Sequence, residues 1–133
     1  MIDEQLEELR RFCLEVEGLN VATTALSGGG VLVRVPDVVI GPGWNRDRAD
    51  VLFVAPPGYP AAKPDCFWVT PGNFRLADGG TPQASNDGNP IPGDIEPGRS
   101  ITWFSWHVQT WHPSRDTLKK YYKVIRSRLT PAR

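Results

Sequence analysis

The stretch GYPAAKPDCFWVTPGN, residues 58–73, decides between fold classes for this sequence. Two prolines bracket a turn, and each one fixes φ and removes a backbone donor, so the chain leaves a preceding strand in one direction. The aromatic and β-branched run at 67–69 predicts a short strand, and Pro71-Gly72-Asn73 predicts the turn that ends it. Cys66, one of the 2 cysteines in the chain, stands between turn and strand. It is either a nucleophile or a small apolar side chain in a core.

The sequence before this stretch predicts a helix followed by an antiparallel meander. Residues 3–17 place apolar side chains at helical spacing between charges, and Gly18 ends the pattern. This apolar face consists of Leu6, Leu9, Phe12, Cys13 and Val16. Runs rich in β-branched residues follow, separated by glycine-rich turns; they lie at 21–26, 31–35 with 37–40, and 51–55. Together with 67–69 they predict a four-stranded antiparallel sheet.

The sequence after this stretch predicts a long irregular loop and then a second helix. Residues 72–102 are dense in Gly, Pro, Asn and Asp, and a loop of this length in a compact domain is usually either functional or disordered. We expect an ordered loop, because large apolar residues recur in it. The tryptophans that follow are interpreted first as core and second as a recognition surface. Ser114 is expected to cap a helix over 114–129.

Composition limits the classes of partner. The 133 residues carry 15 basic and 15 acidic side chains, so no global field draws the chain to nucleic acid or to an anionic membrane. The sequence contains no apolar run of signal-peptide or membrane-span length, and a cytoplasmic protein is expected. The cysteines fit no zinc spacing, and His107 and His112 do not have the i, i+4 spacing of a helical metal pair. We expect no metal and no cofactor.

In this order the elements resemble the ubiquitin-conjugating (UBC) fold, which implies a single α+β domain over residues 1–133. Tyr59-Pro60, with a further proline at 64, resembles the family's tyrosine-proline turn after the fourth strand. Pro71-Gly72-Asn73 stands where the family usually has His-Pro-Asn. Trp111-His112-Pro113 resembles the Trp-x-Pro that precedes the family's next helix. Among UBC-like proteins, the chain is most similar to a bacterial branch, prokaryotic family E.

The resemblance also implies where an active site would lie. In the family an asparagine stabilises the charge that develops when an amine attacks a thioester, and Asn73 is the positional candidate; a turn role for it is equally open. The family's acceptor cysteine follows that asparagine by about eight residues and precedes the Trp-x-Pro tryptophan by about eight. The corresponding interval, 81–103, contains no cysteine. Its hydroxyl residues would need an adjacent base; they are Thr81, Ser85, Ser100 and Thr102.

Two other residues with titratable side chains remain candidates. Cys66 lies before the acceptor interval, where burial and the neighbouring Asp65 would raise the pKa of a thiol, so a packing role is favoured. His107 lies in the aromatic segment that borders the family's groove, where it is a general base, an acyl-group contact or a structural histidine. The candidate catalytic residues are Cys66, His107 and Asn73. The candidate binding residues are Trp103, Trp106 and Tyr59.

The resemblance implies a bacterial ubiquitin-like modification pathway and leaves two functions open. In one, the chain transfers the modifier through a covalent or activated acyl intermediate, which the loop and Asn73 favour. In the other, it holds the modifier or activating enzyme without carrying it, which the absent cysteine favours. The implied partners are a ubiquitin-like protein, often multi-domain in this branch, an adenylating activating enzyme and a JAB-type peptidase. A small hydrolase is a third possibility, and no Gly-x-Ser-x-Gly, phosphate loop or metal motif supports it.

Overall fold

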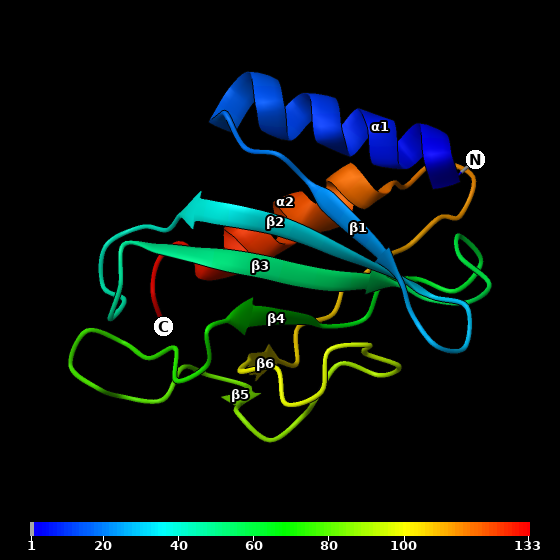
Figure 1. Ribbon diagram of the computed structural model, residues 1–133. Coiled ribbons are helices and arrows are strands. Elements are labelled where there is room, and N and C mark those ends of the chain that lie inside the picture. Colours follow the sequence, from blue (N-terminus) through cyan, green and yellow to red (C-terminus); the bar gives the residue numbers. More distant parts are fainter. Residues whose placement is uncertain (1) are drawn as a thin grey trace.

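A computed structural model describes residues 2–133 and shows helices packed on a twisted antiparallel sheet (Figure 1). The elements are α1 (Ile2–Phe12), a π-helical turn (Cys13–Glu17), β1 (Ala22–Ala25), β2 (Val31–Val39), β3 (Arg48–Ala55), β4 (Phe67–Thr70), β5 (Ser85–Asn86), β6 (Thr102–Phe104) and α2 (Leu118–Leu129). The strand order is β1-β2-β3-β4-β6-β5, with all neighbours antiparallel. The predicted α+β UBC-like arrangement of helix, meander, long loop and helix is confirmed.

The predicted N-terminal helix is present, and its last turn differs from a regular α-helix. Leu6, Leu9 and Cys13 are buried as the periodicity requires, whereas Val16 is 67% exposed and the prediction for it was wrong. Gly18 adopts a left-handed conformation with φ 69°, and the next residue then donates its N–H to the carbonyl of Cys13 at 3.1 Å. Cys13–Glu17 form a π-helical turn, which is wider than an α-helical one. Glu17, at the end of that turn, accepts a hydrogen bond from the Tyr122 hydroxyl of α2 at 2.9 Å.

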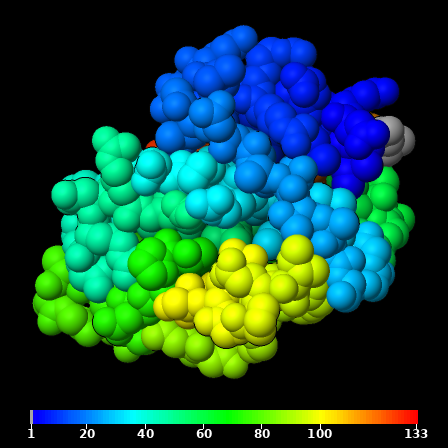
Figure 2. Space-filling model, in the orientation of Figure 1, coloured from blue at the N-terminus to red at the C-terminus, as the bar shows by residue number. Residues whose placement is uncertain are grey.

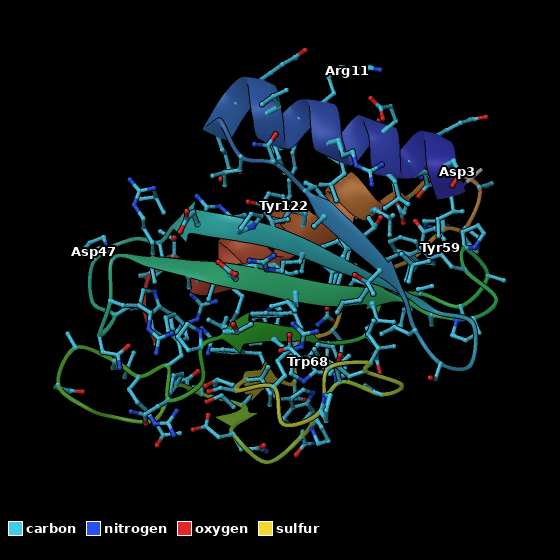
Figure 3. The ribbon with its side chains drawn as sticks, viewed as in Figure 1. Asp3, Arg11, Asp47, Tyr59, Trp68 and Tyr122 are labelled. Atoms are coloured by element: carbon cyan, nitrogen blue, oxygen red, sulfur yellow. The ribbon has the colours of Figure 1, made fainter. Side chains whose placement is uncertain are left out.

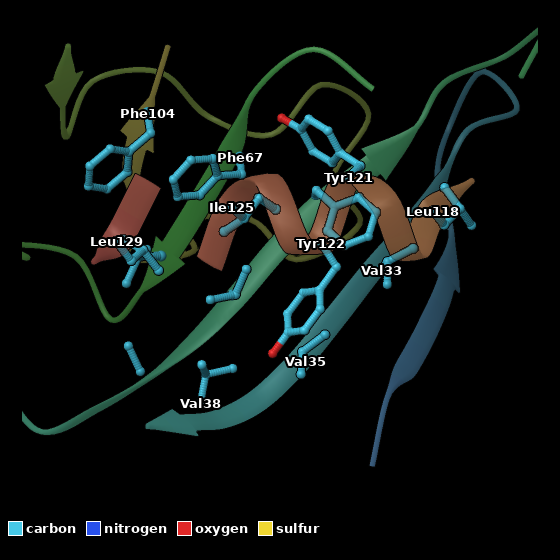
Figure 4. Packing of buried hydrophobic residues seen from close by; sticks show 14 of the residues in the cluster. Val33, Val35, Val38, Phe67, Phe104, Leu118, Tyr121, Tyr122, Ile125 and Leu129 are labelled. Carbon is cyan, nitrogen blue, oxygen red and sulfur yellow. The ribbon is translucent and has the colours of Figure 1, made fainter. Parts of the chain in front are cut away.

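The two faces of the sheet carry different clusters, as the period of a strand requires. On the helix side, β3 contributes Val51 and Phe53 to a cluster that includes both helices. The rings of Phe67 and Phe104 are stacked in this cluster, with centroids 4.7 Å apart (Figure 4). On the other side, Leu52 packs with residues of neighbouring strands and of the long loop. The core therefore consists of two layers, one on each face of the sheet.

The long loop covers the face opposite α2, as Figure 2 shows for its yellow part. Ile91 and Ile101 are buried in the loop-side cluster, so the expectation that apolar residues anchor this segment is confirmed for both. Ile95 does not act as an anchor, because 60% of it is exposed. Trp68, labelled in Figure 3, donates its indole N–H to the carbonyl of Asn89 at 2.8 Å. The loop is therefore fixed to the sheet by both apolar and polar contacts.

Two local predictions were wrong. Residues 72–102 are not free of regular structure, because Ser85–Asn86 form β5 and Thr102 begins β6. The second helix does not begin at Ser114. Its N-cap is Thr117, whose hydroxyl accepts from the Lys120 N–H at 3.3 Å. The preceding residues form a turn in which the Asp116 carboxylate accepts from the His112 N–H at 2.7 Å, which holds them outside the helix.

Gly93 joins the long loop to the β1–β2 turn, and its replacement should destabilise the fold. It has φ +72°, and a Cβ there would lie 2.4 Å from the carbonyl oxygen of Ser27. Gly98 has φ +69° with nothing within 4 Å of such a Cβ. We expect Gly98→Ala to cost about 1 to 2 kcal/mol from left-handed strain alone. Gly93→Ala should cost about 3 to 4 kcal/mol, because the clash adds to that strain. Urea unfolding of both variants checks this, and equal losses would contradict it.

Neither helix in the described part of the chain has the length and apolarity to span a bilayer.

Candidate functional site

Cys66 immediately precedes β4 and is half-buried. It packs against the loop-side cluster beside Trp103, and it lines a largely apolar pocket of about 350 Å³ next to the β1–β2 turn. Burial raises the pKa of its thiol, the side chain of Trp103 opposes this, and the charge of Asp65 raises it further. The thiol is therefore kept in its protonated form, which is the unreactive one.

Asn73 lies beyond the opposite end of β4. It is exposed, with φ 57°, and its main-chain oxygen accepts from Asn45 Nδ2 at 3.0 Å and from Arg46 Nη2 at 3.2 Å. The extended residues of β4 stand between them and advance about 3.3 Å per residue, so Asn73 and Cys66 lie about 10 Å or more apart. The structure therefore does not bring these two candidate catalytic residues together.

A polar network surrounds the turn that contains Asn73. Arg75 and Asp87 form a bidentate ion pair at 2.8 and 3.3 Å. The hydroxyl of Thr102 donates to the same carboxylate at 2.6 Å and accepts from the N–H of Phe74 at 3.1 Å. Burial alone would raise the pKa of Asp87, and the hydrogen bonds from Arg75 and Thr102 outweigh it, so the pKa is lowered. The network favours the ionised form of Asp87 and joins the long loop to β6.

His107 lies at the Cys66 end of the sheet, and 51% of its side chain is exposed. Its Nδ1 is 2.7 Å from both the main-chain oxygen and Oδ1 of Asp65. Both of these oxygens are acceptors, so Nδ1 carries the proton in this arrangement. The other ring nitrogen, Nε2, lies 3.4 Å from the hydroxyl oxygen of Ser105. Asp65 therefore orients the imidazole so that, in the neutral ring, the lone pair of Nε2 faces the hydroxyl of Ser105.

The candidate binding residues make contacts within the chain. Tyr59 donates its hydroxyl to Gln5 Oε1, and burial raises its pKa. Trp103 is half-buried in the loop-side cluster. Trp106 is half-buried against the helix-side core, with the guanidinium of Arg128 5.0 Å from its ring. The packing interpretation of the tryptophans accounts for these contacts, and the edge of Trp106 also lines a pocket of about 600 Å³.

A family model described as prokaryotic E2 family E matches residues 9–132, nearly the whole chain. This chain belongs to prokaryotic E2 family E. Comparison with curated proteins and with solved structures gave no match.

In this prokaryotic E2 family E member, three of the four hydroxyl residues of the interval 81–103 have structural partners, and the fourth, Thr81, is exposed. Ser85 donates to the carbonyl of Pro82 at 2.7 Å, and Ser100 accepts from the N–H of Gly72 at 2.9 Å. Thr102 is fully buried. Within residues 2–133, no three His, Cys, Asp or Glu side chains converge as a metal-binding group. The described interval therefore places no activated nucleophile where the resemblance implied one.

Sequence reasoning identified His107 and missed its relation to Ser105. β4 pairs with β6 in a register that sets Phe67 opposite Phe104, so the residues just before β4 meet those just after β6. Ser105 and His107 are two residues apart, and both line the same pocket. That spacing is visible in the sequence. Their approach to Asp65 depends on a pairing across 42 residues of chain, which no local pattern predicts.

Proposed function

We propose that this prokaryotic E2 family E member acts in the cytoplasm, in a bacterial ubiquitin-like modification pathway, and binds a ubiquitin-like protein without forming a thioester on Cys66. One observation carries the proposal. The family match spans residues 9–132 while the interval 81–103 has no cysteine. The raised pKa of the Cys66 thiol and its distance from Asn73 support the same conclusion. An adenylating activating enzyme and a JAB-type peptidase are the other partners proposed.

The transfer function remains the second candidate, and it needs a nucleophile other than Cys66. Asn73 lies on the turn that the family uses for its asparagine, and Arg46 holds that turn through the carbonyls of Pro71, Gly72 and Asn73 at 2.6, 2.9 and 3.2 Å. This ordered turn is the observation that favours transfer.

The surface that we propose for the modifier surrounds Trp106. The pocket there is lined by apolar side chains, including Val108 and Val124, and by the polar side chains of Gln109 and Thr110. Protein interfaces are enriched in such mixtures of an aromatic residue with a polar rim. Tyr59 and Trp103 would support this surface from within, through the packing described above.

The test is a titration of the ¹⁵N-labelled protein with the ubiquitin-like proteins of the source organism. We expect saturable binding near the micromolar range, about −8 kcal/mol, with shifts centred on Trp106. Trp106→Ala should weaken binding at least about tenfold, because aromatic residues dominate interface energies. Ile95→Ala is the matched control, since Ile95 is exposed in the loop on the other face of the sheet, and it should bind as the parent does. No saturable binding, or equal weakening by both variants, would contradict the proposal.

A further inference from the structure

Three side chains at the Cys66 end of the sheet have the order of groups found in serine nucleophile sites. Ser105 Oγ is 3.4 Å from His107 Nε2, and His107 Nδ1 is 2.7 Å from Asp65 Oδ1. Asp65 lies just before β4, and Ser105 and His107 lie just after β6. Because β4 and β6 are antiparallel neighbours, these residues meet at the same end of the strand pair. A hydroxyl becomes a useful nucleophile only beside a base, and that base is usually oriented by a third group.

The tautomer of the neutral imidazole follows from its partners. The main-chain oxygen and the carboxylate of Asp65 can only accept, so they hold the proton on Nδ1. The Nε2 lone pair is then directed to Ser105, which is the arrangement that a general base requires. A separation of 3.4 Å is longer than an ideal hydrogen bond, and such contacts commonly tighten when a substrate binds.

Space for a substrate lies directly beside these groups. The pocket of about 600 Å³ is lined by both Ser105 and His107, together with Trp106 and Val124. Lys120 lines the same pocket and places a cation there, 2.9 Å from Asp116 Oδ1. The pocket therefore offers apolar surface for an acyl chain beside Ser105 and His107.

Fold stability does not account for this arrangement. The side chains of His107 and Asp65 are 51% and 65% exposed, and exposed ion pairs contribute only about 0 to 1 kcal/mol. Removing either side chain should leave the protein folded, which separates a chemical role from a structural one.

We propose that Ser105 is a nucleophile for activated acyl groups, namely acyl thioesters and active esters, with His107 as its general base and Asp65 as a positioning residue. Ser105 Oγ bonds to the acyl carbon as the bond to the leaving thiol or alcohol breaks. The hydroxyl proton passes to His107 Nε2 and then to the leaving group. Water or an amine next attacks the serine ester, His107 takes the proton of the attacking group, and the serine hydroxyl is restored. This activity goes beyond the proposed binding function and does not depend on it.

The experiment uses p-nitrophenyl acetate as the acyl probe on the full chain. Release of p-nitrophenolate is followed by absorbance, and the acetylated residue is located by peptide mass spectrometry. We expect acetylation of Ser105, and its loss in Ser105→Ala. His107→Gln should slow acetylation about 100-fold or more, the usual contribution of a general base. His112→Gln and Ser114→Ala are the matched controls, because both residues are exposed and outside the cluster, and both should react as the parent does.

Asp65 acts through His107, so its test includes a spectroscopic signal. Asp65→Asn should slow acetylation about tenfold or more and shift the ¹⁵N resonances of the His107 ring away from the Nδ1–H tautomer. Melting temperatures confirm that each variant is folded. Acetylation of other residues with Ser105 unmodified would overturn the proposal. So would acetylation of Ser105 at an equal rate in His107→Gln. Neither result would bear on modifier binding, because the probe contains no protein.

Discussion

Replacing Trp44 by alanine is expected to lower the free energy of unfolding by about 3 to 5 kcal/mol, the usual cost of removing a large buried aromatic side chain. Only 6% of Trp44 is exposed. Its ring is stacked on Phe74, with centroids 4.3 Å apart and an interplanar angle of 18°. Its indole N–H donates to the carbonyl of Leu129, the last residue of α2, at 2.9 Å. The side chain therefore joins the β2–β3 connection to both the long loop and the second helix.

Thermal and urea unfolding measure this loss. For a chain of this size, 3 to 5 kcal/mol corresponds to a fall in melting temperature of roughly 10 to 20 °C. Trp44→Phe is the matched control, because it keeps an aromatic ring for Phe74 and removes the donor to Leu129. It should cost about 1 to 3 kcal/mol, since a buried carbonyl is left unpaired and some volume is lost. If Trp44→Ala lowered the free energy of unfolding by less than Trp44→Phe, Trp44 would not be what joins the β2–β3 connection to the long loop and α2.

The sequence predicts most of the fold because each of the four meander strands contains a recognisable run of β-branched and apolar residues. The run at 51–55 is apolar on both faces, and both faces of β3 are covered. β5 has only two residues, too few for a period, and it exists through its pairing with β6. The helix cap is Thr117 and not the predicted Ser114, because the Asp116 carboxylate accepts from the His112 N–H and holds residues 112–116 in a turn before the helix. Such outcomes depend on tertiary contacts, which residue propensities do not contain.

Less of the candidate site could be predicted from the sequence, because its residues are also brought together by tertiary contacts. Cys66 and Asn73 are seven residues apart, and a strand between them sets them at opposite ends of β4. His107 and Asp65 are 42 residues apart and in contact. Distance along the chain therefore misleads in both directions. The order of motifs identified the family, because a family pattern records the fold without the need to predict each contact.

The second prediction concerns covalent capture of the modifier. When the protein is incubated with the source organism's activating enzyme, ATP and the ubiquitin-like protein, we expect no adduct that a reductant removes. Thioester formation needs a thiolate. Burial raises the pKa of the Cys66 thiol, and Asp65 raises it further. Cys13 is fully buried, and burial raises its pKa to about 12. Neither cysteine combines exposure with a low pKa.

Gel electrophoresis with and without reductant decides this, and three variants identify the atom involved if an adduct forms. A reductant-sensitive adduct that is lost in Cys66→Ser and kept in Cys13→Ser would overturn the packing role of Cys66. An adduct that resists reductant, is cleaved by hydroxylamine and is lost in Ser105→Ala would be an ester on Ser105. That ester would leave the prediction for the thiols intact, because a hydroxyl with an adjacent base would then perform the step that the family assigns to a cysteine.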